Sequence, residues 1–154
     1  MNVTVSEASK HNLHGSLAEF RHQLRMFLLA SENAAIREGL HPQQQQLLLA
    51  VSGAPAGVCP SIAYAAERLG LKHNSAVELV DRCEQEGLLQ RSHDREDGRR
   101  VCLRVTRRGQ KLLDDLSHVH LRELYSQGPR LIEALQRVLQ NEIQSTSHSR
   151  VSKG

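Results

Sequence analysis

Arginine is concentrated in one short stretch of this chain, residues 91–110. The stretch carries seven arginines against three acidic residues, so seven minus three gives it a net charge of +4. The whole chain has a net charge of only +3, which means that the positive charge is local. Guanidinium groups form paired hydrogen bonds with phosphate oxygens. The stretch therefore predicts a surface that binds a phosphate backbone.

Polar side chains also gather on one face of a predicted helix over residues 73–86. The opposite face has apolar residues at helical spacing, namely Ala76, Leu79, Val80 and Cys83. The polar face, with the residue before the helix, presents Lys72, His73, Asn74, Ser75, Val77, Glu78 and Arg82. A DNA major groove admits one α-helix, whose amino-terminal residues reach the base edges. These seven residues are therefore candidates for DNA contacts.

The side-chain types on this face suit different parts of a duplex. Asn74 can form two hydrogen bonds with adenine, Glu78 can accept one from cytosine, and Val77 can pack on a thymine methyl group. The basic and hydroxyl side chains suit phosphates. Glu78 has an alternative partner in Arg82, four residues along the same helix, and would then take no part in base contacts.

The arginine-rich stretch has the pattern of a β-hairpin. Residues 89–93 form one candidate strand, and residues 101–105 show the two-residue alternation of a half-buried strand. Asp97-Gly98 between them is a turn signal, because glycine accepts a positive φ without steric cost. We expect Arg99 at the tip to enter a DNA minor groove, with Asp97 holding its guanidinium. The other hairpin arginines, expected at phosphates, are Arg91, Arg95 and Arg100.

Three helices are predicted before the polar one, over residues 11–38, 42–51 and 60–69. The first has a heptad-like apolar stripe, which is typical of a helix that packs along another helix. Gly70-Leu71-Lys72 makes a short turn between the third and fourth helices, as in a helix-turn-helix. With the basic hairpin directly after it, the pattern is that of a winged helix-turn-helix.

Two helices are predicted after the hairpin. Thr106 can cap the first, which runs to about residue 127, and Gly128-Pro129 starts the second, which runs to 143. The two ends of the chain are small and polar and predict disordered tails, over residues 1–10 and 145–154. The sequence thus predicts one domain over residues 11–144, mainly α-helical with a small β-hairpin.

The stretch from Ala66 to Leu113 resembles the core of MarR-type transcriptional regulators. The motifs that carry the resemblance are AERLGL at 66–71, LVDRCE at 79–84, GL at 87–88, DREDGRR at 94–100 and Thr106 with Gly109. GLHPQQQQLLLAV at 39–51 resembles the family's second helix, so the resemblance covers about residues 11–140. Glu78 departs from the family pattern, which often has a basic residue there, as do Cys83, which replaces leucine, and Gly98, which stands at a frequent arginine.

The resemblance implies a homodimer that binds a pseudo-palindromic site on double-stranded DNA. Its dimerisation helices would be residues 11–38 and 107–143, and its DNA-binding part would be residues 42–106. The resemblance also implies a ligand-responsive repressor, with a small lipophilic or phenolic effector bound between the two parts. Such an effector would change the spacing of the two DNA-binding parts and hence the affinity for DNA.

Composition argues against several other classes of protein. Aromatic residues make up only 3% of the chain, which disfavours proteins that stack bases on aromatic rings. No apolar run approaches the roughly 18 residues that span a bilayer, so no membrane contact is expected. There is no glycine-rich phosphate loop, no GxSxG and no HExxH motif, which predicts neither an enzyme nor a cofactor. Three cysteines without a CxxC motif favour a reducing cytoplasm.

Three alternatives to this interpretation stay open. A winged helix can serve as a protein-interaction module without binding DNA, and a basic hairpin can simply be solvated. A thiol-responsive regulator would use Cys59, which precedes Pro60 at a helix start where the helix dipole lowers a thiol pKa. Some MarR-type relatives sense oxidants through a cysteine near the start of the first helix, but no cysteine precedes Cys59. We therefore expect Cys59, Cys83 and Cys102 to be structural.

A metal-responsive regulator is the third alternative. The histidines that could contribute are His11, His14, His22, His118 and His120. They do not combine with acidic residues at a recognisable ligand spacing, so we expect surface histidines and no metal.

Overall fold

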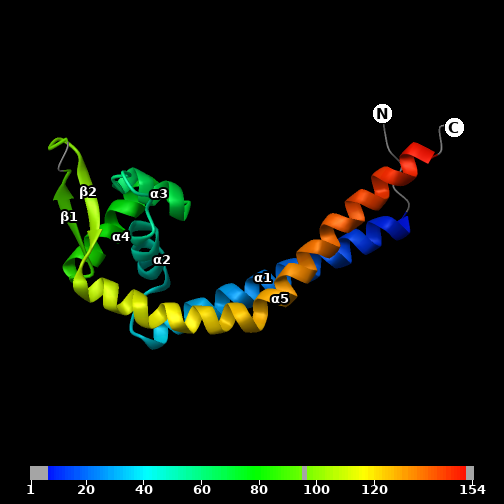
Figure 1. The fold of residues 1–154 in the computed structure, drawn as a ribbon, viewed down its shortest axis with the longest axis horizontal. Coiled ribbons are helices and arrows are strands. Elements are labelled where there is room, and N and C mark those ends of the chain that lie inside the picture. Colours follow the sequence, from blue (N-terminus) through cyan, green and yellow to red (C-terminus); the bar gives the residue numbers. More distant parts are fainter. Residues whose placement is uncertain (1–6, 95–96, 152–154) are drawn as a thin grey trace. The chain divides into compact units, whose positions relative to one another are not determined.

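The computed structural model describes residues 7–94 and 97–151 (Figure 1). Its elements, in chain order, are α1 (Glu7–Arg37), α2 (Pro42–Ser52), α3 (Ile62–Leu69), α4 (His73–Gln85), β1 (Leu89–His93), β2 (Val101–Val105) and α5 (Arg107–Val151). The predicted fold, mainly helical with a small antiparallel hairpin, is confirmed. The chain divides into two compact units, one of residues 32–120 and one of residues 1–31 with 121–154.

The unit of residues 32–120 contains the hydrophobic core. The largest of its fully buried side chains lie on α2, α4, the hairpin, the start of α5 and the link from α4 to β1, and they include Leu47, Leu48, Leu79, Leu88, Leu89, Leu103 and Leu116. Ala35 of α1 and Ala65 of α3 are buried in the same core. Ala76, Leu79, Val80 and Cys83 are all buried, which confirms the predicted inner face of α4. The outer face of α4 is therefore left for solvent or a partner.

A sharp turn places α4 after α3. The Oγ atom of Ser61 accepts a hydrogen bond from the N–H of Tyr64 and so caps α3. Gly70 ends α3 in the left-handed region, with φ 63°, where a side chain would be strained. The predicted helix-turn-helix is present, with α3 starting at Ile62 rather than at Pro60.

The hairpin leads directly into α5. β1 and β2 pair antiparallel, with Leu89 opposite Val105 and His93 opposite Val101. The predicted cap at Thr106 is confirmed, since its Oγ1 atom accepts a hydrogen bond from the N–H of Gly109 at 3.1 Å. The same hydroxyl donates to the carbonyl oxygen of Gly87, so this residue also joins the helix start to the end of α4.

The second unit contains the first part of α1 and the last part of α5, which run antiparallel. The side chain of Asn12 donates to Asn141 at 3.0 Å, and Asn141 donates to Ser16 at 2.8 Å. Large apolar side chains of this unit remain exposed on both helices, at Leu17, Leu24, Met26, Leu28, Leu29, Leu121, Leu124, Tyr125, Ile132, Leu135 and Leu139. The heptad-like stripe of α1 is therefore only partly covered within one chain.

The helix boundaries differ from the prediction at both ends of the chain. A single helix, α5, replaces the two helices expected after the hairpin, with Pro129 inside it. Gly128 removes one obstacle, because it has no Cβ to clash with the ring of the following proline, although Pro129 still lacks the N–H that would bond within the helix. Residues 7–10 and 145–151, expected to belong to tails, are helical, and the rest of the expected tails lies outside the described residues. None of the helices in the described ranges has the length and apolar character needed to cross a bilayer.

Candidate nucleic-acid interface

The amino-terminal half of α4 presents the polar face that its sequence predicts. Lys72, His73, Asn74, Ser75, Glu78 and Arg82 are exposed, and Val77 is partly buried. No side chain caps the helix at Lys72, so its first N–H groups are open to solvent or to an anion. Glu78 and Arg82 form no ion pair in the described part of the chain, which leaves the carboxylate of Glu78 available to a partner.

The tip of the hairpin is a tight turn over Asp97–Arg100. The N–H of Arg100 donates to the carbonyl oxygen of Asp97 at 2.9 Å, and Asp94 N–H donates to Arg100 at 2.8 Å. Gly98 does not have the positive φ that we expected of it, so the turn does not depend on that property. The carboxylate of Asp97 accepts a hydrogen bond from the backbone N–H of Arg99 at 3.1 Å, which corrects the expected contact with the guanidinium.

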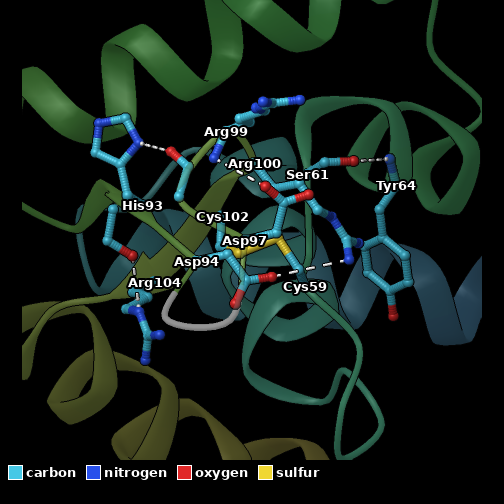
Figure 2. The surroundings of a disulfide bond; sticks show 12 residues. Cys59, Ser61, Tyr64, His93, Asp94, Asp97, Arg99, Arg100, Cys102 and Arg104 are labelled. Carbon is cyan, nitrogen blue, oxygen red and sulfur yellow. Dashed lines mark hydrogen bonds and ion pairs between the residues drawn. A yellow bond between two sulfur atoms is a disulfide. The ribbon is translucent and has the colours of Figure 1, made fainter.

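The side chain of Arg99 is exposed at the tip, whereas that of Arg100 points toward Asp94 (Figure 2). Arg100 lies 3.8 Å from the carboxylate of Asp94, a loose contact that leaves most of its side chain exposed. On β2, Arg104 donates to the hydroxyl of Ser92 at 2.7 Å. Arg95 lies outside the described residues.

Arg91 occupies a different environment from the other arginines. Its guanidinium pairs with Asp81 at 2.6 Å and with Glu84, both on α4, and its N–H also donates to Glu84. The hydrogen bond to Asp81 raises the pKa of Arg91 above its usual value. Two carboxylates already neutralise this cation, so the phosphate contact expected of Arg91 is poorly supported. Its contacts instead fix β1 against α4.

The arrangement of helix-turn-helix and hairpin is similar to that of known proteins. Residues 38–100, which include α2, α3, α4 and the first half of the hairpin, match the model of the MarR family. The helix-turn-helix and the first half of the hairpin are therefore of the MarR type. A search of curated protein sequences found no match.

Several solved structures share the MarR-type fold. AbsC, a MarR family transcriptional regulator from Streptomyces coelicolor, is 16% identical, with a TM-score of 0.66 over 95% of this chain and 97% of that one. CouR from Rhodococcus jostii, solved with p-coumaroyl-CoA bound, is 26% identical, with a TM-score of 0.59 over 84% and 86%. A variant of MepR from S. aureus, bound to an oligodeoxyribonucleotide, is 16% identical, with a TM-score of 0.56 over 86% and 93%.

In the unit of residues 32–120, two cysteines are bonded to each other. A disulfide joins Cys59, in the segment between α2 and α3, to Cys102 on β2, with their Cα atoms 5.2 Å apart (Figure 2). From the sequence we expected structural cysteines and no bond between any two of them, and the second expectation is wrong. The pairing is non-local, across 43 residues, and the spacing of the cysteines along the chain does not reveal it.

Cys83 is a free and buried thiol, as predicted. Burial, assisted by the negative charge of Glu86, raises the pKa of Cys83 from 9.0 to about 11. The thiol therefore stays protonated at neutral pH and is a poor nucleophile.

One group of potential metal ligands occurs in the described ranges, formed by Cys59, Asp94 and Cys102, whose ligand atoms lie within 4.8 Å of one another. While the two sulfurs are bonded to each other they are not thiolates, so the group has no thiolate ligand in this state. The histidines that the sequence singled out do not belong to the group. One of them, His120 on α5, instead contacts the buried side chain of Gln45 at 3.0 Å.

Proposed function

We propose that this chain binds double-stranded DNA sequence-specifically as a homodimer in the cytoplasm, that it represses transcription there, and that a small effector relieves the repression. The observation that carries the proposal is the exposed polar face of α4, next to a hairpin whose tip exposes Arg99 and Arg100. The match of residues 38–100 to the MarR family model and the oligonucleotide bound to the MepR variant support it.

The proposal assigns base contacts to α4. With its inner face in the core, α4 can enter a major groove only through the face that carries Asn74 and Glu78. Both side chains are exposed near the amino-terminal end, where a recognition helix reaches base edges. Lys72, His73 and Ser75, with the open N–H groups of the first turn, would contact phosphates.

The hairpin would act as the wing. The backbone N–H of Arg99 donates a hydrogen bond to the carboxylate of Asp97, which orders the backbone at the tip and leaves the exposed guanidinium to a partner. This arrangement suits insertion into a narrow minor groove, where negative potential is strongest. Arg100 would contact a phosphate alongside.

A second copy of the chain would cover the apolar side chains of α1 and α5. Leu17, Leu24, Leu135 and Leu139 are examples, and each is at least 36% exposed in one chain. Two-fold pairing would place two α4 helices at half-sites about 34 Å apart, one turn of DNA. Light scattering should give twice the chain mass, and Leu139→Glu should shift it toward one chain mass.

The effector proposal rests on a relative. CouR was solved with p-coumaroyl-CoA bound, which supports a small lipophilic or phenolic effector for this chain. An effector that favours a non-binding arrangement should release the protein from DNA. Thermal shift with a panel of aromatic acids and their thioesters, followed by gel shift with each hit, tests this step.

Selection from random duplex DNA tests the function as a whole. Repeated rounds with the purified full chain should enrich a pseudo-palindrome, and footprinting on it should show two protected half-sites on one face of the duplex. A pool that remains random after selection would instead favour a winged-helix module that binds other proteins.

A further inference from the structure

We propose that the Cys59–Cys102 disulfide is a reversible redox site that sets the affinity of the protein for DNA through the hairpin. The part of the inference that concerns affinity rests on the proposed DNA binding. The bond itself, its access to solvent and the segments that it joins are properties of residues 32–120 alone.

The disulfide joins the two segments that position the candidate DNA contacts. Cys59 lies two residues before Ser61, which caps α3 and so begins the helix-turn-helix. Cys102 lies two residues after Arg100, at the end of the hairpin tip. Figure 2 shows the bond between these segments, with Asp94, Arg100 and Ser61 close by. Changing this bond therefore changes how firmly the tip is held relative to the helix-turn-helix.

Among the described residues, a backbone hydrogen bond also joins the same two segments. The N–H of Leu103 donates to the carbonyl oxygen of Pro60 at 2.7 Å. A single hydrogen bond between backbone groups stabilises a contact far less than a covalent bond constrains it. After reduction, the hairpin would keep this hydrogen bond and its pairing with β1 but would lose its covalent tie to the segment before α3.

Small molecules in solution can reach the disulfide. Cys59 is partly exposed, whereas Cys102 is 4% exposed. Both cysteines line an open cavity of about 580 Å³, together with Asp94, Arg100, Arg104 and Gln110. This access distinguishes the pair from Cys83, which is fully buried and holds a protonated thiol. A low-molecular-weight thiol can therefore attack the sulfur of Cys59.

A small dithiol can reduce the disulfide without any further reactant. A thiolate of the dithiol attacks the Cys59 sulfur, the S–S bond breaks, and Cys102 leaves as a thiolate that takes up a proton. The second thiol of the reductant then attacks the mixed disulfide and releases Cys59. Two electrons pass to the protein, and the reductant leaves as a cyclic disulfide.

Re-oxidation by a hydroperoxide closes the cycle. The Cys59 thiolate attacks a peroxide oxygen, the O–O bond breaks, and an alcohol or water leaves while Cys59 becomes a sulfenic acid. The Cys102 thiol then attacks that sulfur, and water leaves as the disulfide forms. Both electrons go to the hydroperoxide, which is the oxidant class that the proposal names.

The oxidised state is the one that binds DNA more tightly. A wing that is already held in place loses less conformational freedom on binding than a mobile one. We expect reduction to weaken the affinity about tenfold, a change of the size that pre-organisation produces. Base preference should remain, because the residues of α4 stay in place.

The first measurement follows the bond without DNA. The full chain is equilibrated in dithiothreitol buffers of graded potential, alkylated under native conditions and analysed by mass spectrometry. In reducing buffers the cysteines at 59 and 102 should become alkylated together. A reduced sample that is treated with cumene hydroperoxide before alkylation should instead contain the disulfide. A pair that is already alkylated without reductant, or that never re-forms, would overturn the redox site.

The second measurement uses the duplex selected above as the probe, at fixed salt. Cys59→Ser should bind like reduced wild-type protein in both buffers, and Cys102→Ala should do the same if the serine variant folds poorly. The control Cys83→Ala should keep the difference between oxidised and reduced protein. Equal affinity of the two wild-type states overturns the switch alone. Binding in neither state, including failure to select any duplex, overturns the proposed function and the switch with it.

Discussion

The carbonyl oxygen of Leu88 lies 2.2 Å from the position that a Cβ atom would take on Gly109. The same oxygen accepts a hydrogen bond from the N–H of Thr106 at 3.1 Å. The start of α5 therefore packs directly on the backbone that leads from α4 into β1. In this chain Thr106 and Gly109 have complementary roles in the contact, because one residue caps the helix and the other permits its close approach.

Gly109→Ala should destabilise the protein. The new methyl group would meet backbone and the side chain of Val105 at 2.8 Å, so the hairpin or the helix has to shift. Overpacking of this kind costs about 1–3 kcal/mol in the free energy of unfolding, which denaturant melts can measure. Gly15→Ala in α1 is the matched control, since its Cβ would meet nothing within 4 Å. This substitution should raise the free energy of unfolding by as much as about 1 kcal/mol. Equal effects of the two substitutions would contradict the close contact.

Arg91→Ala should lower stability without changing the salt dependence of DNA binding. The substitution leaves Asp81 and Glu84 without their shared cation, and the two partly exposed ion pairs together contribute about 1–2 kcal/mol. Chemical denaturation measures the loss, and titration of duplex DNA at several salt concentrations measures the slope. A slope reduced by about one would show that Arg91 contacts a phosphate after all.

The buried thiol of Cys83 should make stability fall at alkaline pH. Its pKa is about 11 in the folded protein and 9.0 without burial, so the unfolded chain releases the proton first as pH rises. The stabilisation that the buried, protonated thiol gives the folded protein is complete below pH 9 and is lost between pH 9 and 11. The comparison uses a chain carrying Cys59→Ser and Cys102→Ala, with and without Cys83→Ala, so that no disulfide exchanges. Its unfolding free energy should fall relative to the chain without Cys83, and parallel curves would refute the shift.

The local parts of the fold could be predicted because their signals are local. The spacing of Ala76, Leu79, Val80 and Cys83 defines the inner face of α4, and Thr106 is recognisable as a cap. Gly128-Pro129 was misleading, since its sequence has the form of a break, whereas α5 continues through Pro129.

The missed features of the site depend on contacts between distant residues. Arg91 has the same sequence signal as Arg99, and only the placement of Asp81 and Glu84 across from β1 separates a structural arginine from an exposed one. Cys59 and Cys102 likewise meet only because the segment before α3 lies against β2. A stretch of arginines predicts a surface, but the fold decides which of them reach it.

Arg99→Ala should weaken binding to duplex DNA and reduce the salt slope by about one charge. The side chain is exposed at the hairpin tip, so its removal should leave the melting temperature unchanged. Arg130→Ala, an exposed arginine of α5 outside the helix-turn-helix, removes the same charge and serves as the control. If the two variants bind alike, the hairpin is not a wing.

Asn74→Ala should relax base preference more than it lowers total affinity. The amide can distinguish adenine through two hydrogen bonds, and losing such a pair costs about 1–3 kcal/mol of discrimination at one base position. Repeating the duplex selection with the variant should return the same site, degenerate at one position in each half. A uniform loss of affinity for all sequences would count against base contact by this residue.

The central claim concerns residues 60–106, which form a helix-turn-helix and an arginine-tipped hairpin for binding duplex DNA. Fluorescence anisotropy of a labelled duplex, titrated with wild-type oxidised protein from 50 to 300 mM salt (about the range in which counterion release is clear), tests it most directly. The logarithm of the affinity should fall linearly with the logarithm of salt, with a slope of roughly 0.9 per phosphate contacted. A protein that fails to bind duplex DNA at the lowest salt, or binds it independently of salt, would contradict the account.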